Sequence, residues 1–326
     1  MIHQRHGRWM AAAMALAALA GSAFLGGCGR STGITRTDDT TEYGNASRPE
    51  LIAELKNRME HIYTLTAKTH VEMVDQSVEH NGKFPTTEVN GQLLLKRGPD
   101  GNCQVRFSVQ TLLPPTNFTF LARNEDFWIL MPDFTKDPAK DGKKGTVFIG
   151  TTLRNETRSR ESFSYRPQDL ADVFLVDEVF DISALVYMET WKQYYILHFL
   201  RRDRPEHLYS KIWINRIGGN MSVHQIFDRS GELLVEGRFL DYRNYKSRAG
   251  DFAAPLPRRF SVIWPRDQLA LHVELDNVKL NDQVRDQAFE PALPSTYRVF
   301  KLRGDDAEAT PGRIEERLPT APPVGD

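Results

Sequence analysis

The sequence predicts a mainly β (α+β) fold, in which a large curved antiparallel sheet is covered by an N-terminal helix and a helical insert. Apolar residues recur with a period of about 3.6 up to residue 63 and of about 2 after it, which is the change from helix to strand. The alternating runs are joined by turns so short that consecutive strands have to be antiparallel. An open sheet of roughly a dozen strands curls, and its apolar inner face needs cover.

Length and composition indicate a folded protein rather than a disordered one. The chain has 326 residues, of which 40% are hydrophobic and 10% aromatic, enough to bury a sizeable core. Lysine and arginine number 42 against 43 acidic residues, and the two signs are mixed along the chain. Because nucleic-acid binding leaves a clustered basic footprint, we expect no nucleic-acid partner.

Two stretches have the pattern of helices. Ser47 and Glu50 form a capping box, since the serine can accept from an early helix N–H and the glutamate can reach back. The apolar residues that follow at helical spacing are Leu51, Leu55, Met59 and Ile62. They predict an amphipathic helix over residues 48–63. Residues 168–174 and 182–188 are predicted as short helices of an insert between two groups of strands.

The strands are predicted from alternating runs bounded by turn residues. Asn90–Gly91, Gly218–Gly219 and residues 228–231 are turn signals. Residues 269–275 alternate cleanly, and the phase then breaks, which predicts a bulge near Asn277. The predicted strands are residues 68–78, 92–96, 104–112, 117–122, 127–131, 146–150, 194–200, 208–215, 221–227, 233–242, 259–264 and 268–275.

The N-terminus carries an uncharged run from Trp9 to Gly29, long enough for a transmembrane helix. Alanine and glycine dominate the run, and it follows a short basic start containing Arg5 and Arg8. That layout favours a secretory signal peptide, residues 1–27, over a membrane span.

The end of this run, Leu25-Gly26-Gly27-Cys28, resembles the lipobox of bacterial lipoproteins. The resemblance implies that Cys28 is lipidated and becomes the first mature residue, which would hold the chain on a membrane. The alternative is an ordinary cleaved signal that happens to end near a cysteine. Gly29, where an aspartate would indicate inner-membrane retention, favours the outer membrane. Residues 28–47 are polar and are expected to form a flexible tether.

The sequence offers little support for catalysis. Cys28 and Cys103 are its two cysteines, so a disulfide framework and a multi-cysteine metal site are excluded, and Cys103 is expected to be an inert strand residue. The nine histidines show no metal-binding spacing, and no nucleophile elbow, P-loop or dinucleotide fingerprint occurs. We therefore expect no enzyme activity, no metal and no cofactor.

Three passages share bulky apolar alternation: residues 93–97 with 105–107, residues 126–132 with 147–150, and residues 212–214 with 227–231, 239–242 and 256–259. In this order they resemble the bacterial lipoprotein-localisation family, the LolA/LolB type, over about residues 49–300. The resemblance implies an unclosed half-barrel over residues 48–302, whose concave apolar face, lidded by helices, binds acyl chains. Residues 303–326 have no counterpart and are expected to be disordered. The candidate cavity residues are Phe107, Phe118, Phe120, Phe127, Trp213, Phe239 and Trp264.

The family's membrane-anchored type presents an apolar loop between its third and fourth strands. Leu112 and Leu113, followed by two prolines, fall in about that place and are candidates for membrane contact. The same residues also suit a tight, half-buried connection.

Two functions remain open on these grounds. The first is a lipid-anchored periplasmic protein that holds an acyl chain, lipid or lipoprotein in a hydrophobic half-barrel, with a role in trafficking to the outer membrane. Its partners would be the membrane, through the N-terminal lipid, and the hydrophobic ligand. The second is a structural or interaction lipoprotein of the cell envelope with a filled core and no ligand. An apolar cavity on the concave face would favour the first.

Overall fold

The computed structural model of the chain describes residues 45–77, 86–98, 103–112, 115–124, 126–132, 144–151, 166–176, 185–201, 207–228, 230–250 and 252–301. The predicted signal peptide, Cys28, most of the predicted tether, Leu113 and the predicted tail 303–326 lie outside these residues.

The described strands form one 14-stranded sheet in the order β14-β6-β5-β4-β3-β2-β1-β13-β12-β11-β10-β9-β8-β7. Neighbouring strands are antiparallel, except that β14 pairs with β6 in parallel. The predicted mainly β fold with a curved, unclosed sheet is thus confirmed. The strands are β1 Thr64–Asp75, β2 Thr86–Arg97, β3 Cys103–Leu112, β4 Pro115–Arg123, β5 Asp126–Pro132, β6 Gly145–Thr151, β7 Leu185–Thr190, β8 Tyr194–Leu200, β9 Leu208–Asn215, β10 Met221–Phe227, β11 Leu233–Lys246, β12 Ala253–Trp264, β13 Leu269–Leu280 and β14 Tyr297–Lys301.

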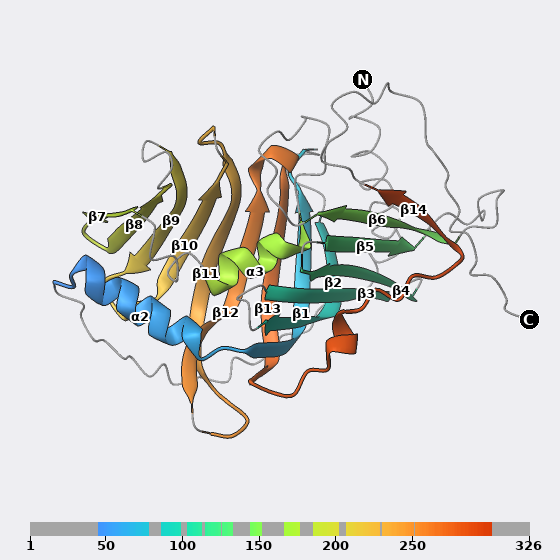
Figure 1. Cartoon of the computed structure of the whole chain (residues 1–326), viewed down its shortest axis with the longest axis horizontal. Coiled ribbons are helices and arrows are strands. Elements are labelled where there is room, and N and C mark those ends of the chain that lie inside the picture. Colours follow the sequence, from blue (N-terminus) through green and yellow to red (C-terminus); the bar gives the residue numbers. More distant parts are fainter. Residues whose placement is uncertain are drawn as a thin grey trace, which may run out of the picture.

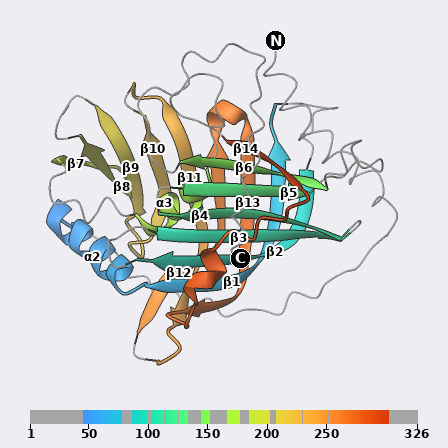
Figure 2. The ribbon, with the colours of Figure 1, turned by 45° about the vertical axis from the view of Figure 1, so that its right-hand side comes forward.

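The sheet bends so strongly that its two halves face each other. Figure 1 shows the sheet curving around helix α3 (Pro167–Leu175), and Figure 2 shows β3 to β6 crossing in front of β11 to β13. Helix α2 (Arg48–Glu60) lies along one end of the strands in the half formed by β7 to β13, beside β7 to β12 (Figure 1). The inner, concave face therefore holds the main apolar core, between the two halves and under the helices.

Helix α2 begins as predicted and ends three residues earlier. The Ser47 backbone N–H donates to Glu50 Oε2 at 2.7 Å, and Leu51, Leu55 and Met59 form the buried stripe. The helix stops at Glu60, because the chain turns there into β1. Ile62 lies beyond the helix end but is buried as predicted, with 2% of its surface exposed.

Two predictions were wrong. The described part of the predicted helix 182–188 is not helical, since residues 185–190 are strand β7, which pairs with β8 and directs Val186 and Met188 toward the core cluster. Asn90–Gly91 is no turn but lies inside β2. A Cβ on Gly91 would press on the Ser108 carbonyl oxygen of β3, so a glycine there permits the close approach of strands in a tightly curved sheet.

Other turn and bulge predictions were confirmed. Asn277 has φ +49°, and β13 carries one extra residue opposite β1 at this point, as a bulge requires. Gly218 and Gly219, with φ of +83° and +60°, turn the chain between β9 and β10. Cys103 is buried in β3 and forms no disulfide with a described residue.

The C-terminal part of the domain runs over the outer, convex face. Residues Asp286–Phe289 form the short 3-10 helix η3, which contacts β3 and β4, and Arg106 donates from β3 to the Ala288 carbonyl at 2.8 Å. Phe289 is fully buried there. The described residues end with β14 beside β6, a strand that the sequence patterns did not indicate.

Candidate functional site

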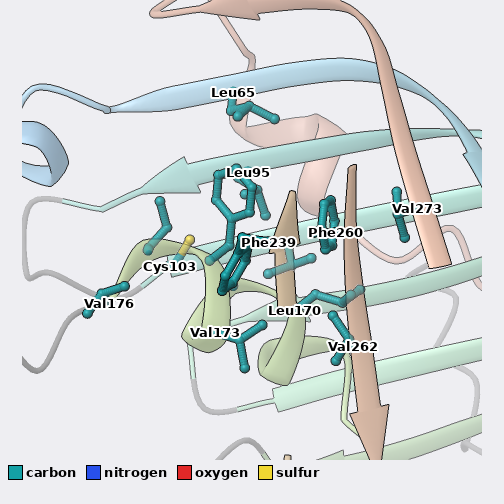
Figure 3. Packing of buried hydrophobic residues seen from close by; sticks show 14 of the residues in the cluster. Leu65, Leu95, Cys103, Leu170, Val173, Val176, Phe239, Phe260, Val262 and Val273 are labelled. Atoms are coloured by element: carbon teal, nitrogen blue, oxygen red, sulfur yellow. The ribbon is translucent and has the colours of Figure 1, made fainter. Parts of the chain in front are cut away.

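Helix α3 fills the concave face. It contacts β3, β4 and β5 from one half of the sheet and β10 and β11 from the other. Phe174 packs edge-on against Phe239 and Phe260, at ring-centroid distances of 6.4 and 5.5 Å. Figure 3 shows Leu170 and Val173 of the helix close to the same two sheet residues. This helix is therefore the part of the chain that separates the two halves.

Local sequence fixes the start of α3, and packing fixes its end. Pro167 occupies the first turn, where a missing N–H costs nothing, and Asp169 accepts from the Arg166 backbone N–H at 3.0 Å. At the other end Val176 has φ +51° although it is β-branched, a conformation that costs about 1–2 kcal/mol. Val176 is fully buried, so packing holds it there.

A buried polar cluster ties the start of α3 to the sheet. Arg166 Nη2 lies 2.7 Å from Asp169 Oδ1, and the two side chains are 3% and 4% exposed. Trp264 Nε1, at the end of β12, donates to Asp169 Oδ2 at 2.9 Å. We call these three residues the latch. Removing one member of such a buried pair is strongly destabilising, because the other charge stays buried.

His224 ties the second half of α3 to β10. Its Nδ1 lies 3.1 Å from the Val173 carbonyl oxygen and its Nε2 lies 2.9 Å from Ser210 Oγ. A carbonyl oxygen only accepts, so the Nδ1 proton is on the helix side and the serine hydroxyl donates to Nε2. This fully buried histidine therefore has a structural role, as expected for single histidines in strands.

A small apolar pocket lies beside the start of α3. Its volume is about 20 Å³, room for about one water molecule, which needs roughly 10–15 Å³ on the same measure. Sites for drug-sized ligands measure roughly 300 to 1,000 Å³. With α3 in place, this pocket is therefore too small for an acyl chain. It is lined by Met73, Phe107, Phe120, Arg166, Pro167, Leu170, Trp264, Leu269 and Leu271.

The structure brings six of the seven candidate cavity residues together. Phe107, Phe127, Phe239 and Trp264 belong to the core cluster, and Phe118 and Phe120 pack against it. Trp213 lies apart from them. Its neighbours Ile212 and Ile214 point into the core, so alternation turns Trp213 to the other face, where its ring meets those of Trp191 and Tyr194.

The candidate membrane loop is only partly described. Leu112 is the last residue of β3, and its side chain and Leu113 lie outside what the structure describes. The lipidation site Cys28 also lies outside it. Sequence reasoning missed the latch, because Asp169 and Trp264 are distant in the chain and only the folded sheet joins them.

Within the described residues, no group of three or more His, Cys, Asp or Glu side chains is placed to hold a metal ion. Nor is any helix in this part of the chain long and apolar enough to span a membrane.

No protein-family model and no curated protein matches the chain. Solved structures that resemble it include a LolA superfamily protein from Nitrosomonas europaea, with 13% identity, a TM-score of 0.45 and coverage of 76% of this chain and 99% of that one. A DUF1329 family protein from Desulfovibrio piger has 15% identity, a TM-score of 0.46 and coverage of 74% and 94%. A putative outer membrane lipoprotein-sorting protein domain from Vibrio parahaemolyticus has 12% identity, a TM-score of 0.46 and the same coverage. We carry no function over from structures this dissimilar.

Proposed function

We propose that the chain is a lipid-anchored periplasmic binding protein, which takes up an acyl chain, lipid or lipoprotein on the concave face of its sheet in exchange for α3. The main support for the proposal is one observation. Among the described residues, the nine-residue helix α3 covers the apolar side chains between the two halves of the sheet. If α3 moved out, Phe107, Phe239 and Phe260 would line an open apolar groove.

The exchange is energetically reasonable. Leu170, Val173, Phe174 and Leu175 are the large apolar side chains that α3 buries, each at about 1.5–3 kcal/mol. An acyl chain gains about 0.8 kcal/mol for every methylene it buries. A chain of roughly ten methylenes therefore replaces the apolar contacts that the helix gives up.

The anchoring part of the proposal is supported by sequence alone. The lipobox-like Leu25-Gly26-Gly27-Cys28 follows a signal-like run, and Gly29 favours the outer membrane. Mass spectrometry of the mature N-terminus tests it, since an unmodified or uncleaved Cys28 contradicts the anchor. A role in lipid or lipoprotein trafficking between membranes would follow from a bound ligand and an anchor together.

One observation favours the second candidate, a structural lipoprotein with a filled core. The pocket beside α3 holds only about 20 Å³, as expected where a core is filled rather than hollow. The binding function requires that α3 moves off the concave face, whereas the structural function requires that it stays there.

A disulfide between α3 and the sheet separates them. A Cβ built on Gly237 of β11 lies 3.0 Å from the Val173 Cβ, against about 3.8 Å in disulfides, so cysteines at both positions can bridge after a small shift. The Phe239 ring, 2.8 Å from the same point, has to turn aside. The variant Gly237→Cys/Val173→Cys is made together with Cys103→Ser, because Cys103 is the natural cysteine among the described residues and could otherwise form a competing disulfide.

We expect the reduced variant to bind a fluorescent fatty acid and the oxidised variant to lose that binding, with recovery on reduction. The two single-cysteine variants, treated alike, control for the cost of each substitution. Equal binding by the oxidised and reduced forms would place the ligand elsewhere. No binding by the unaltered chain, together with native mass spectrometry that finds no lipid, would favour the structural function.

A further inference from the structure

Exposed apolar side chains gather at one corner of the sheet. Tyr187 of β7, Trp191 in the β7–β8 turn and Ile217 in the β9–β10 turn are 59%, 53% and 60% exposed. We call these three residues the tip patch. Leu185 of β7, 48% exposed, extends it along the strand. Single exposed apolar residues are common, but a group of large ones indicates an interaction surface.

The two turns lie together in space. Strands β7 and β9 both pair antiparallel with β8, so the turns that follow them are at the same end of the sheet. The Arg216 backbone N–H donates to the Gln193 carbonyl at 2.9 Å, which joins one turn to the other. Arg216 Nη1 also donates to the Lys192 carbonyl at 3.3 Å. The corner is therefore a connected unit rather than two independent loops.

Aromatic packing supports the patch from behind. The Trp191 ring meets Trp213 edge-on at 5.6 Å, and Trp213 meets Tyr194 at 5.7 Å. The Tyr187 ring lies 5.7 Å from that of His198. These contacts leave more than half of Trp191 and Tyr187 exposed while holding their rings in place. Trp213, which lies apart from the concave face, therefore has its role here, where it supports the Trp191 ring.

The charge around the patch is mainly basic. Lys192 and Arg216 flank the two turns in sequence. The nearby acid, Glu189, lies 3.1 Å from His198 Nε2, with which it forms an ion pair when the histidine is protonated. Protein surfaces that bind at the boundary of an anionic bilayer combine tyrosine and tryptophan with lysine and arginine, as this corner does.

The N-terminal chain reaches the domain at this same corner. The Ala46 backbone N–H donates to Tyr195 Oη of β8 at 3.1 Å, and Arg48 Nη1 donates to the Val186 carbonyl of β7 at 2.7 Å. Figure 1 shows α2 starting beside β7. Between Cys28 and residue 45 the chain can span at most about 60 Å. An anchor on Cys28 would thus attach to the domain at this corner and keep the corner within about 60 Å of the membrane.

We propose that the tip patch rests on the anionic surface of the bilayer that carries the N-terminal anchor. The β7 corner then faces the lipid, and the patch is distinct from residues 112 and 113 between β3 and β4, in the other half of the sheet. The inference rests on the anchor of the proposed function but is independent of a ligand on the concave face.

The test uses the mature chain from Gly29 to Asp326 without lipid, which contains every described element. Its binding is measured by flotation with vesicles of phosphatidylcholine alone and of phosphatidylcholine with phosphatidylglycerol. We expect binding to the anionic vesicles, about tenfold weaker in Trp191→Glu/Ile217→Glu. The matched control is Leu240→Glu/Val299→Glu, which alters side chains 58% and 53% exposed elsewhere and should bind like the unaltered chain.

A second measurement uses the lipidated chain in proteoliposomes with brominated lipids. Quenching of tryptophan emission should fall in Trp191→Phe relative to the unaltered chain. Equal vesicle binding by the double variant and its control, or unchanged quenching, would overturn the proposal. Loss of a dimer in Trp191→Glu/Ile217→Glu without any vesicle binding would overturn it in favour of a contact between copies. N-terminal mass spectrometry and fatty-acid binding are measured separately, so failure of the anchor or of the ligand site is distinguishable from failure of the patch.

Discussion

Replacing Asp169 by asparagine should release α3 while leaving the sheet folded. Asparagine has nearly the same shape, and its amide oxygen can still accept from Trp264 Nε1, so the substitution removes mainly the charge that faces Arg166. The guanidinium, 3% exposed, is then left buried opposite a neutral group. Breaking such a buried pair costs about 3–5 kcal/mol, which lowers the ratio of docked to undocked helix between about a hundredfold and a few thousandfold.

Hydrogen exchange measured by mass spectrometry reports the release of α3 from the sheet directly. Exchange should accelerate in residues 167–175 and remain slow in β11 and β12. If the proposed exchange is correct, fatty-acid affinity rises at the same time, since less docked helix competes for the concave face.

The matched control is Asp172→Asn on the same helix. Its carboxylate accepts from Gln168 Nε2 at 3.0 Å in a partly exposed position, so its replacement should cost less than that of the buried Asp169. Unchanged exchange in residues 167–175 of Asp169→Asn, or equal acceleration across α3 and the sheet, would refute the view that α3 docks as a separable element.

Two further predictions concern pH. Lys96 Nζ donates to Asp286 Oδ1 at 2.5 Å and holds the pKa of that carboxyl below its ordinary 3.8, so the stability it gives η3 is present above pH 3.8 and is lost as pH falls through the lower folded value. The hydrogen-exchange protection factor over residues 286–289, which corrects for the slower intrinsic exchange in acid, should therefore fall as pH falls, and Asp286→Asn should abolish that change. Tyr242→Phe should cost about 0.5–1.5 kcal/mol at neutral pH, because the hydroxyl donates to the Met221 carbonyl at 2.7 Å. Burial raises the Tyr242 pKa above its ordinary 10.0, so the unaltered protein loses stability as pH rises beyond 10.0. Urea unfolding should show that this alkaline loss is smaller in Tyr242→Phe, and an equal loss in both proteins would contradict the assignment.

Much of the fold could be predicted because strand and helix periods differ and because turn residues interrupt them. Helix α3 was predicted to within a residue at each end, from its apolar spacing. Strand β7 was missed because its pattern is short and half-exposed, and pairing with β8 decides its conformation. Strand β14 depends in the same way on the edge that β6 offers.

The site was harder to predict than the fold. Alternation shows that Ile212 and Trp213 face opposite sides of β9 but not which side is the core, since both residues are apolar. The latch joins Asp169 to Trp264 through a tertiary contact that no local spacing contains. The filling of the concave face by α3 follows only from the bend of the whole sheet.

The pairing of β1 with β13 has a consequence for how the chain folds. Leu65, near the start of the domain, lies opposite Leu280, near its end. Strands β1 to β6 and β7 to β13 each form from neighbours in sequence, whereas the seam between the two groups closes only after almost the whole domain has been synthesised. Contacts of such long sequence separation slow folding. A chain released or truncated before β13 would present β1 as an open edge, and the delay would suit a protein that crosses a membrane before it folds.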